Sequence, residues 1–407
     1  TIKDVDCEAC AISGFRLISE NKVLDNTLLG FNNDHAAHYF CGDIVVDKLF
    51  DYIDPEELIT PTRDGVAWGL GIMKDIKKKI IEIFEPLLTE QRKILQSSQT
   101  HSHEMDKTEN DVKNLVNKIA KDTNFFLKKY LRKQKYSGLI SPMNYGLFSG
   151  GKKIRSKILV DVGKIFNISY KKLITIGAAV ECIHAYTLIH DDLPCMDNDL
   201  TRRGKPSTHV KFGEATAVLA GNSLLTLAFE ILSDKKLNIK EKTKNILIDK
   251  LSRCAGHTGI AGGQFLDLDF EKKNIPFKKI IDMQLKKTGK LFGYCSSVPA
   301  IIKNDNVKKI NTFEAIGSDL GLLFQISDDL IDYKGDSIKA GKKTKKDNKL
   351  GKATLISLLG YKKTVIYSEK LRKKIQKKIM KYGQRSKNLS ETINYILKRS
   401  KWAIINI

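Results

Sequence analysis

Two short segments, far apart in the chain, are rich in aspartate and lie in otherwise apolar surroundings, at residues 190–197 and 325–332. Their carboxylates belong to Asp191, Asp192, Asp197, Asp328, Asp329 and Asp332. Like charges at this density repel one another, so burying them without cations would be costly. Mg²⁺ relieves such repulsion, because it binds a few carboxylate oxygens together with water and the oxygens of a substrate phosphate. The two segments therefore predict a site for Mg²⁺ and a diphosphate.

The second aspartate segment suits a helix. Asp329 and Asp332 are three residues apart, and Asp328 and Asp332 are four apart, so these side chains share one helical face. Gln325 lies one turn before Asp329 on that side. A solvated helix end with scattered acids would account for one such segment alone, but two in one chain make that explanation much weaker.

The first aspartate segment does not suit one regular helix. Asp191 and Asp197 are six residues apart, a spacing that is poor for a single helical face, and Pro194 lies between them. Proline cannot continue a helix without removing a backbone hydrogen bond. We therefore expect the helix to end or deform near Pro194 and the chain to fold Asp197 back.

Charge is unevenly distributed along the 407 residues, whose net charge is +23. Residues 1–104 carry 11 Lys and Arg against 18 Asp and Glu, whereas residues 105–407 carry 59 against 29. This break predicts an acidic N-terminal extension of unassigned fold and function, followed by a second domain. The basic surplus could serve nucleic acid, anionic substrates or a solvated surface. Runs such as 342–346 lack aromatic residues, so we favour a solvated surface and no nucleic-acid partner.

The seven cysteines are scattered and odd in number, which argues against a secreted, disulfide-bonded scaffold. No apolar run approaches the ~18 residues that a membrane-spanning helix needs. Residues 1–6 lack the basic start and apolar run of a secretory signal. We therefore expect no membrane span and a cytoplasmic location, or an organelle if a targeting peptide is missing.

The basic part of the chain has helical periodicity. Apolar residues recur three and four positions apart in long segments, glycine and proline cluster between these segments, and alternating strand-like runs are scarce. The predicted helices are 111–133, 156–168, 171–190, 213–233, 239–254, 277–302, 309–333 and 364–383. The sequence therefore predicts an all-α bundle.

The N-terminal extension gives fewer signals. Residues 73–95 have the pattern of an amphipathic helix, and the polar residues 97–104 are predicted to be a linker, with Met105 as a natural start for the second domain. Thiolate and imidazole ligands suit zinc, and the candidates here are Cys7, Cys10, His35, His38 and Cys41. Their spacing fits no established pattern, so we favour ordinary buried or surface positions for them.

Cationic side chains flank both aspartate segments. Arginine can hold a phosphate through two parallel hydrogen bonds, and lysine adds a mobile point charge. The candidates for phosphate binding are Lys152, Arg155, His184, Arg202, Arg203, Lys287, Thr288, Lys342 and Lys352. The alternative for residues 150–155 is a turn that leads into a basic helix start, and a lone histidine is more often an ordinary polar contact.

From about Met105 onward the chain resembles a trans-isoprenyl diphosphate synthase of the farnesyl and geranylgeranyl branch. The resemblance covers roughly three quarters of the chain, and an ordered set of motifs is far more specific than any one of them. The motifs occur at 150–155, 181–186, 191–197, 202–206, 213–215, 262–264 with Asp267, 287–289, 324–332 and 350–352. The resemblance implies an isoprenoid-synthase-type helical bundle with a central cavity.

The resemblance also implies a role for each site residue. Mg²⁺ would be bound by Asp191, Asp197 and Asp328, supported by Asp192, Asp329 and Asp332. Isopentenyl diphosphate would be held by Lys152, Arg155, His184 and Arg203. The allylic diphosphate would be held by Arg202, Lys287, Thr288, Gln325, Lys342 and Lys352.

The implied reaction is a Mg²⁺-dependent head-to-tail condensation of isopentenyl diphosphate with an allylic diphosphate, carried out by a homodimer. Mg²⁺ and the cations would stabilise the departing diphosphate, and an apolar cavity would keep water from the allylic cation. In similar enzymes the residue five before the first aspartate limits product length, and here it is Tyr186. An aromatic side chain favours farnesyl diphosphate, whereas residues 194–199 look more like those of geranylgeranyl synthases, which leaves that product as the alternative.

Two interpretations from other classes compete. A terpene cyclase would share the metal chemistry, but it normally lacks the second aspartate motif and an isopentenyl site, so the cations at 152–155 oppose it. A non-catalytic partner of a synthase usually loses these aspartates. The sequence departs from the family pattern at Ser156, where proline is usual, and at Asn222, where aspartate is usual.

Overall fold

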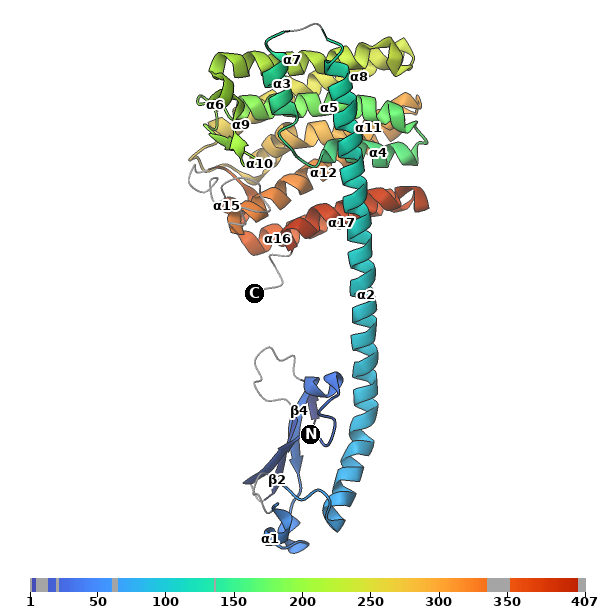
Figure 1. The fold of residues 1–407 in the computed structure, drawn as a ribbon, viewed down its shortest axis with the longest axis vertical. Helices are drawn as coiled ribbons and strands as arrows, with labels where there is room; N and C mark the ends of the chain where they lie inside the picture. The colour runs from blue at the N-terminus through green and yellow to red at the C-terminus, as the bar shows by residue number, and fades with distance from the viewer. Residues whose placement is uncertain are drawn as a thin grey trace. The chain divides into compact units, whose positions relative to one another are not determined.

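The structure is a computed structural model of the chain, and it describes residues 2–4, 14–19, 22–60, 65–134, 137–334 and 352–401. It divides into two compact units, Thr1–Lys107 and Thr108–Ile407 (Figure 1). This division falls three residues after the break in charge at residue 104.

The first unit contains a four-stranded sheet with the strand order β1-β4-β2-β3. β1 (Ile2–Asp4) pairs antiparallel with β4 (Phe40–Val45), and β2 (Gly14–Ser19) pairs antiparallel with β3 (Lys22–Thr27). β2 and β4 are parallel neighbours at the centre. The short helical turns of this unit are η1 (His35–Tyr39), η2 (Leu49–Asp51) and α1 (Pro55–Leu58).

Aromatic side chains join this sheet to the long helix α2 (Gly71–Leu131). The ring of Phe84 on α2 makes edge-to-face contacts with Phe15 at 4.8 Å and with Phe40 at 5.2 Å between centroids. Such pairs contribute about 0.5–1.5 kcal/mol beyond the burial of their area. Leu88, one turn further along α2, is fully buried in the same cluster. The amphipathic helix predicted at 73–95 is therefore confirmed.

The linker predicted at 97–104 is wrong, because α2 is helical without interruption from Gly71 to Leu131. The segment contains neither glycine nor proline, the residues that most strongly end a helix. Polar composition alone does not end a helix. Further along the same helix, Ile119 and Leu127 lie in the core of the second unit, in agreement with the helix predicted at 111–133.

The zinc candidates of the first unit are only partly described. Cys7 and Cys10 lie outside the described residues. His38 Nε2 lies 3.1 Å from the carbonyl oxygen of Asn32, and Cys41 is half-buried. Within the described ranges, no three His, Cys, Asp or Glu side chains converge as a metal cluster.

The second unit is a bundle of helices. They are α3 (Ile140–Leu147), α4 (Ile154–Ile165), α5 (Tyr170–Asp191), α6 (Thr208–Phe212), α7 (Glu214–Ser233), α8 (Glu241–Ala255), α9 (Ile260–Asp269), α10 (Phe277–Gln284), α11 (Lys290–Ile302), α12 (Val307–Lys334), α15 (Leu355–Leu359), α16 (Tyr361–Met380) and α17 (Lys387–Lys401). Shorter elements are the ribbon of β5 (Thr201–Arg202) and β6 (Lys205–Pro206) and the turns η3 (Lys235–Leu237), η4 (Leu285–Gly289) and η5 (Gly383–Ser386). Most helices predicted from periodicity are confirmed to within a few residues, but the segment 277–302 is divided into α10, η4 and α11, and the helix predicted at 111–133 is the end of α2, which begins at Gly71. The helices α3, α6, α9, α15 and α17 were not predicted.

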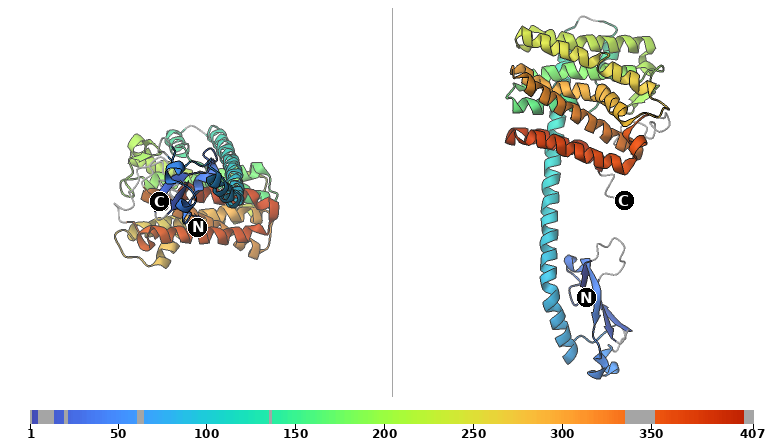
Figure 2. Two further views of the ribbon diagram at one scale, coloured as in Figure 1. Left: turned by 90° about the horizontal axis from the view of Figure 1, so that it is seen from below. Right: turned by 180° about the vertical axis from the view of Figure 1, so that it is seen from behind.

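α5 and α11 form the middle of the bundle. α5 packs against α4 and α7, and α11 packs against α4, α8 and α12. Figure 1 shows α7 on one side of this central pair and α12, α16 and α17 on the other, and the view from behind in Figure 2 shows the same layers. Because α5 and α12 carry the two aspartate segments, this packing brings residues far apart in the sequence into one bundle.

Two described helices, α5 and α7, are long and apolar enough to span a membrane by length and composition. The sequence expectation that no apolar run approaches that length is therefore not met. In α5, 72% of the apolar window is buried within the protein, and in α7 the figure is 44%. Core helices of a bundle pass the same test, so two such helices are weak evidence for a membrane span.

A threonine of α17 binds to a buried ion pair of α4. Lys157 Nζ lies 2.6 Å from Asp161 Oδ1 and 2.8 Å from Thr392 Oγ1, and all three residues have 0% exposure. Burial lowers the pKa of Lys157, and the charge of Asp161 works against that shift. A buried charge is tolerated only when it is paired and hydrogen-bonded. The C-terminal helix therefore supplies a polar group that the inside of the bundle needs.

Candidate active site

The chain turns back on itself where α5 ends at Asp191. The backbone N–H of Asp197 donates to the carbonyl oxygen of Asp191 at 2.9 Å. Asn198 follows with φ of +51°, in the left-handed region that asparagine tolerates better than most residues. The fold-back predicted around Pro194 is therefore confirmed.

The second aspartate segment is held by amide side chains. Asp329 Oδ1 accepts a hydrogen bond from Gln325 Nε2 at 2.8 Å, and Asp329 Oδ2 accepts one from Gln284 Nε2 at 3.2 Å. Thr288 Oγ1 donates to Gln325 Oε1 at 3.0 Å and thereby orients this amide. Asp329 and Asp332 are each 5% exposed. The amide donors fix a buried carboxylate and offset part of the cost of removing it from water.

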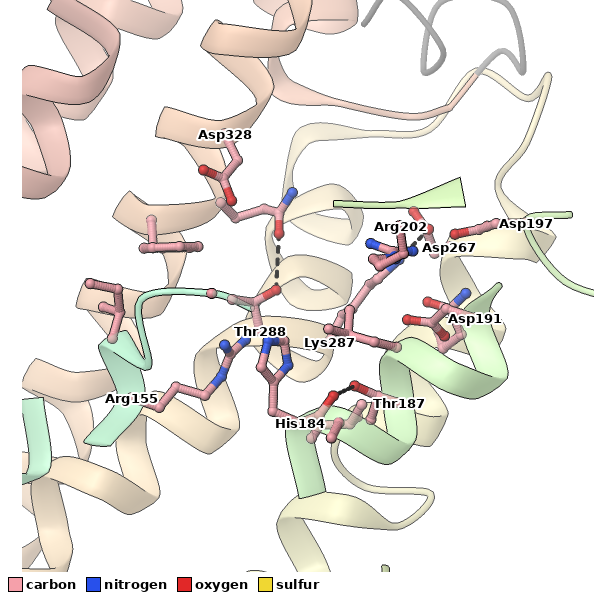
Figure 3. A pocket seen from close by; sticks show the side chains of 18 of the residues that line it. Arg155, His184, Thr187, Asp191, Asp197, Arg202, Asp267, Lys287, Thr288 and Asp328 are labelled. Carbon is pink, nitrogen blue, oxygen red and sulfur yellow. Dashed lines mark hydrogen bonds and ion pairs between the residues drawn. The ribbon is translucent and has the colours of Figure 1, made fainter. Parts of the chain in front are cut away.

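Both aspartate segments line a single cavity of about 440 Å³. The acidic residues in its wall are Glu181, Asp191, Asp197, Asp199, Asp267, Asp328, Asp329 and Asp332. In Figure 3, Asp191 and Asp197 lie on one side of the cavity, Asp328 lies on the other, and Lys287 lies between them. The two segments thus face a common space.

Asp192 stands behind the cavity wall and binds Arg202. Its carboxylate accepts a hydrogen bond from Arg202 Nε at 2.9 Å, and Asp192 is only 3% exposed. Burial raises the pKa of Asp192, against the opposing effect of Arg202. Arg202 itself lines the cavity. Asp192 therefore acts on the site through the arginine that it orients.

A first group of basic side chains lines the cavity wall, namely Lys152, Arg155, His184 and Arg203. The Arg155 guanidinium lies 5.0 Å from the centroid of the Phe292 ring, and in Figure 3 it is close to His184. Burial lowers the pKa of His184 well below its usual value, and Arg155 and Arg203 lower it further. His184 is therefore neutral at pH 7 while no anion is bound.

Gly151 allows Arg203 to reach this group. Its φ is +101°, and a Cβ atom at this position would lie 2.6 Å from the guanidinium carbon of Arg203. Arg203 also donates a hydrogen bond to the carbonyl oxygen of Gly150. The glycine pair therefore places a cation as well as turning the chain.

A second group of cations shares one carboxylate. Lys287 Nζ lies 2.7 Å from Asp267 Oδ2, and Lys352 Nζ lies 3.2 Å from the same oxygen and 3.0 Å from Asp197 Oδ1. Burial raises the pKa of Asp267, but the two lysines outweigh it and hold the pKa below its usual value. Asp267 is therefore a counter-ion that keeps two cations together.

An irregular turn presents Lys287 and Thr288 to the cavity. Leu285–Gly289 forms a π-helical turn between α10 and α11, a feature that is frequent at functional sites. Gly263 of α9 packs against it so closely that a Cβ would lie 2.2 Å from the backbone nitrogen of Lys287. The glycine explains why α9, which carries Asp267, can approach the turn.

Besides Asp192, two predicted residues are not seen in the cavity wall. Lys342 lies outside the described residues. Tyr186 is buried, its hydroxyl lies 3.3 Å from the carbonyl oxygen of Ala255, and its ring packs edge-on against His190. The adjacent Ala185 lines the cavity. Tyr186 therefore lies directly behind the wall.

Sequence reasoning gave no role to Asp267, Gln284 or Glu181. Glu181 Oε1 accepts hydrogen bonds from Ser156 N at 3.2 Å and from Ser156 Oγ at 3.0 Å. Proline, which the family usually has at this position, could supply neither donor. The departure at Ser156 therefore adds two bonds to a buried acid of the cavity wall.

The acidic side chains suit Mg²⁺ by their chemistry, because all of them offer hard oxygen ligands. Asp191 accepts no hydrogen bond from any described side chain, and burial raises its pKa to about 6 despite the attraction of Lys287. A divalent cation would favour the charged form of this carboxylate. The residues therefore fit the ion, although the described acids do not already converge as a metal cluster.

The sequence model of a family described as polyprenyl synthetase matches residues 137–396. The chain belongs to this family. The farnesyl diphosphate synthase of Escherichia coli (strain K12) is 38% identical over 275 residues, which cover 65% of this chain and 90% of the relative. The farnesyl diphosphate synthase of Micrococcus luteus is 36% identical over 292 residues, which cover 72% and 97%.

Solved structures agree with this assignment. An FPP/GFPP synthase from Zymomonas mobilis has a TM-score of 0.64 and 36% identity, over 70% of this chain and 99% of that one. A geranyltransferase from Helicobacter pylori, described as complexed with magnesium and isoprenyl diphosphate, has a TM-score of 0.60 and 26% identity, over 70% and 96%. The resemblance and the all-α bundle drawn from the sequence are confirmed.

Replacing Asp267 is expected to destabilise the free protein. Asp267→Asn would leave Lys287 and Lys352 close together without their shared counter-ion, at a cost of about 3 kcal/mol. Thermal unfolding should show a lower midpoint for Asp267→Asn, and added inorganic pyrophosphate should recover most of the loss. The control is Asp269→Asn, since Asp269 pairs with Lys273 at an exposed position on the same helix. Equal shifts for the two variants would contradict the role given to Asp267.

Proposed function

We propose that this chain is a short-chain prenyl diphosphate synthase that makes farnesyl diphosphate by head-to-tail condensation. Membership of the polyprenyl synthetase family makes it a prenyltransferase. Curated relatives that are 36–41% identical are named farnesyl diphosphate synthases. The observation that supports the proposal most directly is the single cavity lined by both aspartate segments and by both groups of cations.

In this proposal the two diphosphates bind to different cations. The allylic diphosphate is held by Arg202, Lys287, Thr288, Gln325 and Lys352, with Lys342 as a further candidate beyond the described residues. Isopentenyl diphosphate is held by Lys152, Arg155, His184 and Arg203. A terpene cyclase would not need the residues that hold isopentenyl diphosphate, and a non-catalytic partner would not need intact aspartates.

Mg²⁺ is proposed to bind Asp191, Asp197 and Asp328, with Asp192, Asp329 and Asp332 in support. When bound, the ion would add positive charge next to a departing diphosphate. The protein's own part is to orient the carboxylates, as Gln284 and Gln325 do for Asp329.

The remaining side chains suit a reaction through an allylic cation. Lys287, Lys352 and Arg202 are fixed before the substrate arrives, so they can stabilise negative charge that develops on the leaving diphosphate without reorganising. Apolar side chains such as Leu188 and Phe324 line the same cavity and exclude water. The isopentenyl double bond then forms the new carbon–carbon bond, and loss of a proton completes the product. No covalent nucleophile is required.

Turnover tests this function directly. The chain, supplied with Mg²⁺, isopentenyl diphosphate and a five- or ten-carbon allylic diphosphate, should yield a fifteen-carbon product. Asp328→Asn should lower kcat roughly 100-fold or more, since it removes a charge aimed at the metal and the diphosphate. The control is Asp319→Asn on the same helix, because Asp319 pairs with Lys374 and Lys378 away from the cavity. Absence of a prenyl product, or equal loss in both variants, would rule the proposal out.

Product length is expected to depend on Tyr186, although the ring lies behind the cavity wall. Tyr186→Ala would remove a buried aromatic ring next to Ala185 and open space for a longer chain. Chromatography should then show products longer than fifteen carbons. Tyr186→Phe keeps the ring and should keep the original product. A twenty-carbon product from the unmodified chain would favour geranylgeranyl synthesis, the activity named for a 33% identical relative from Catharanthus roseus.

We further propose that the chain forms a homodimer through α7. This helix is apolar, yet less than half of its most apolar stretch is buried. Between its charged ends, the exposed residues of this helix recur at helical spacing and form one stripe, Ala215, Val218, Leu219, Asn222 and Thr226. An apolar helix face that the chain itself leaves uncovered is typical of a protein interface.

Disruption of this stripe should separate the subunits. Leu219 is 52% exposed, so Leu219→Glu would put a charge in the proposed interface without disturbing the core. Sedimentation equilibrium should give twice the monomer mass for the unmodified chain and the monomer mass for the variant. Ile366→Glu, at an exposed position of α16, is the matched control. A monomeric unmodified chain would disprove the dimer.

A further inference from the structure

Lys152 is the most exposed of the described cations that line the cavity. Its residue is exposed, and it lies in an irregular stretch in which Gly150, Gly151 and Lys153 all have positive φ. A lysine in such a position normally samples many rotamers, and ordering the side chain costs up to about 2 kcal/mol. Lys152 is nevertheless held in one place, because its Nζ donates a hydrogen bond to Tyr395 Oη at 2.7 Å.

Tyr395 is a rigid partner for this lysine. It lies on α17 and is 7% exposed. Three residues earlier, Thr392 Oγ1 lies 2.8 Å from both Lys157 Nζ and Asp161 Oδ2 inside the bundle. Fixed points so close to Tyr395 leave its hydroxyl little freedom to move.

A second fixed point follows Tyr395 directly. The carbonyl oxygen of Ile396 accepts a hydrogen bond from Ser327 Oγ at 2.9 Å, and both residues have 0% exposure. Ser327 precedes Asp328 in α12, so this bond ties α17 to the helix of the second aspartate segment. The tyrosine hydroxyl therefore keeps a fixed position relative to both α4 and α12, which carry residues of the cavity wall.

We propose that Tyr395 is a positioning residue for isopentenyl diphosphate and acts through Lys152. The inference rests on the proposed function and extends it, since Tyr395 does not line the cavity itself. By holding the ammonium group before the substrate binds, the hydroxyl removes part of the entropy cost of binding. Lys287 and Lys352, which are proposed to hold the other diphosphate, are ordered by Asp267 instead. Tyr395 should therefore affect one substrate and not the other.

The test is Tyr395→Phe, which removes the hydroxyl and keeps the buried ring. The KM for isopentenyl diphosphate should rise about tenfold, the lower end of what is expected for losing a hydrogen bond to a charged group. The KM for the allylic diphosphate and kcat should stay within about twofold. Tyr367→Phe is the matched control, because Tyr367 of α16 makes no hydrogen bond among the described residues and its ring packs on Phe277. This control should leave both KM values unchanged.

A double-mutant cycle with Lys152→Met separates positioning from a general loss of structure. If Tyr395 acts through Lys152, adding Tyr395→Phe to Lys152→Met should change the KM for isopentenyl diphosphate no further. Additive effects, equal changes in both KM values, or no change in Tyr395→Phe would overturn the inference while prenyl synthesis stands. Absence of product from the unmodified chain would overturn both. A destabilised Tyr395→Phe is judged by the ratio of the two KM values, because loss of folded protein lowers kcat and leaves that ratio unchanged.

Discussion

Repulsion among buried carboxylates is the constraint on which this site depends. Eight acids line one cavity, and such a set is stable only if each member has a cation, a hydrogen-bond donor or a proton. The chain supplies all three kinds of compensation. Arg202 pairs with Asp199, amides bind Asp329, and burial raises the pKa of Asp191 to about 6, so this carboxyl keeps a proton at a higher pH than an exposed aspartate does. In the free protein these groups do what a metal ion and a diphosphate would do in the complex.

The same reasoning explains why Asp267 binds two lysines. Lys287 and Lys352 would repel each other without an anion between them, and the diphosphate that is proposed to bind there is itself an anion. In the free protein, the carboxylate of Asp267 is the anion between the two lysines. Substrate binding would then replace one counter-ion by another, so neither lysine is ever buried without a partner. This arrangement keeps the cations preorganised at little cost in stability.

Local spacing predicted the parts of the site that depend on one element. The face shared by Asp328, Asp329 and Asp332 follows from helical geometry, and the fold-back of Asp197 follows from a proline placed after a helix. Contacts between elements were beyond such reasoning, because Gln284 meets Asp329 only once α10 and α12 have packed. The linker at 97–104 failed for another reason. Polar composition indicates exposure, but only glycine, proline or lost hydrogen bonds end a helix. The sheet of the first unit was not predicted, because its strands have no clear alternation of apolar and polar residues.

The C-terminal helix shows how a segment with no catalytic motif can govern a site. Within five residues, α17 contacts α4 through Thr392, the glycine-rich turn through Tyr395 and α12 through Ile396. A helix is stiff over so short a length, so these three contacts cannot shift independently. The buried pair of Lys157 and Asp161 makes the first contact hard to break, because separating Thr392 from it would leave polar groups unsatisfied inside the bundle. The spacing between Lys152 and the aspartates of α12 is therefore set by α17, and not by the loops that carry the motifs.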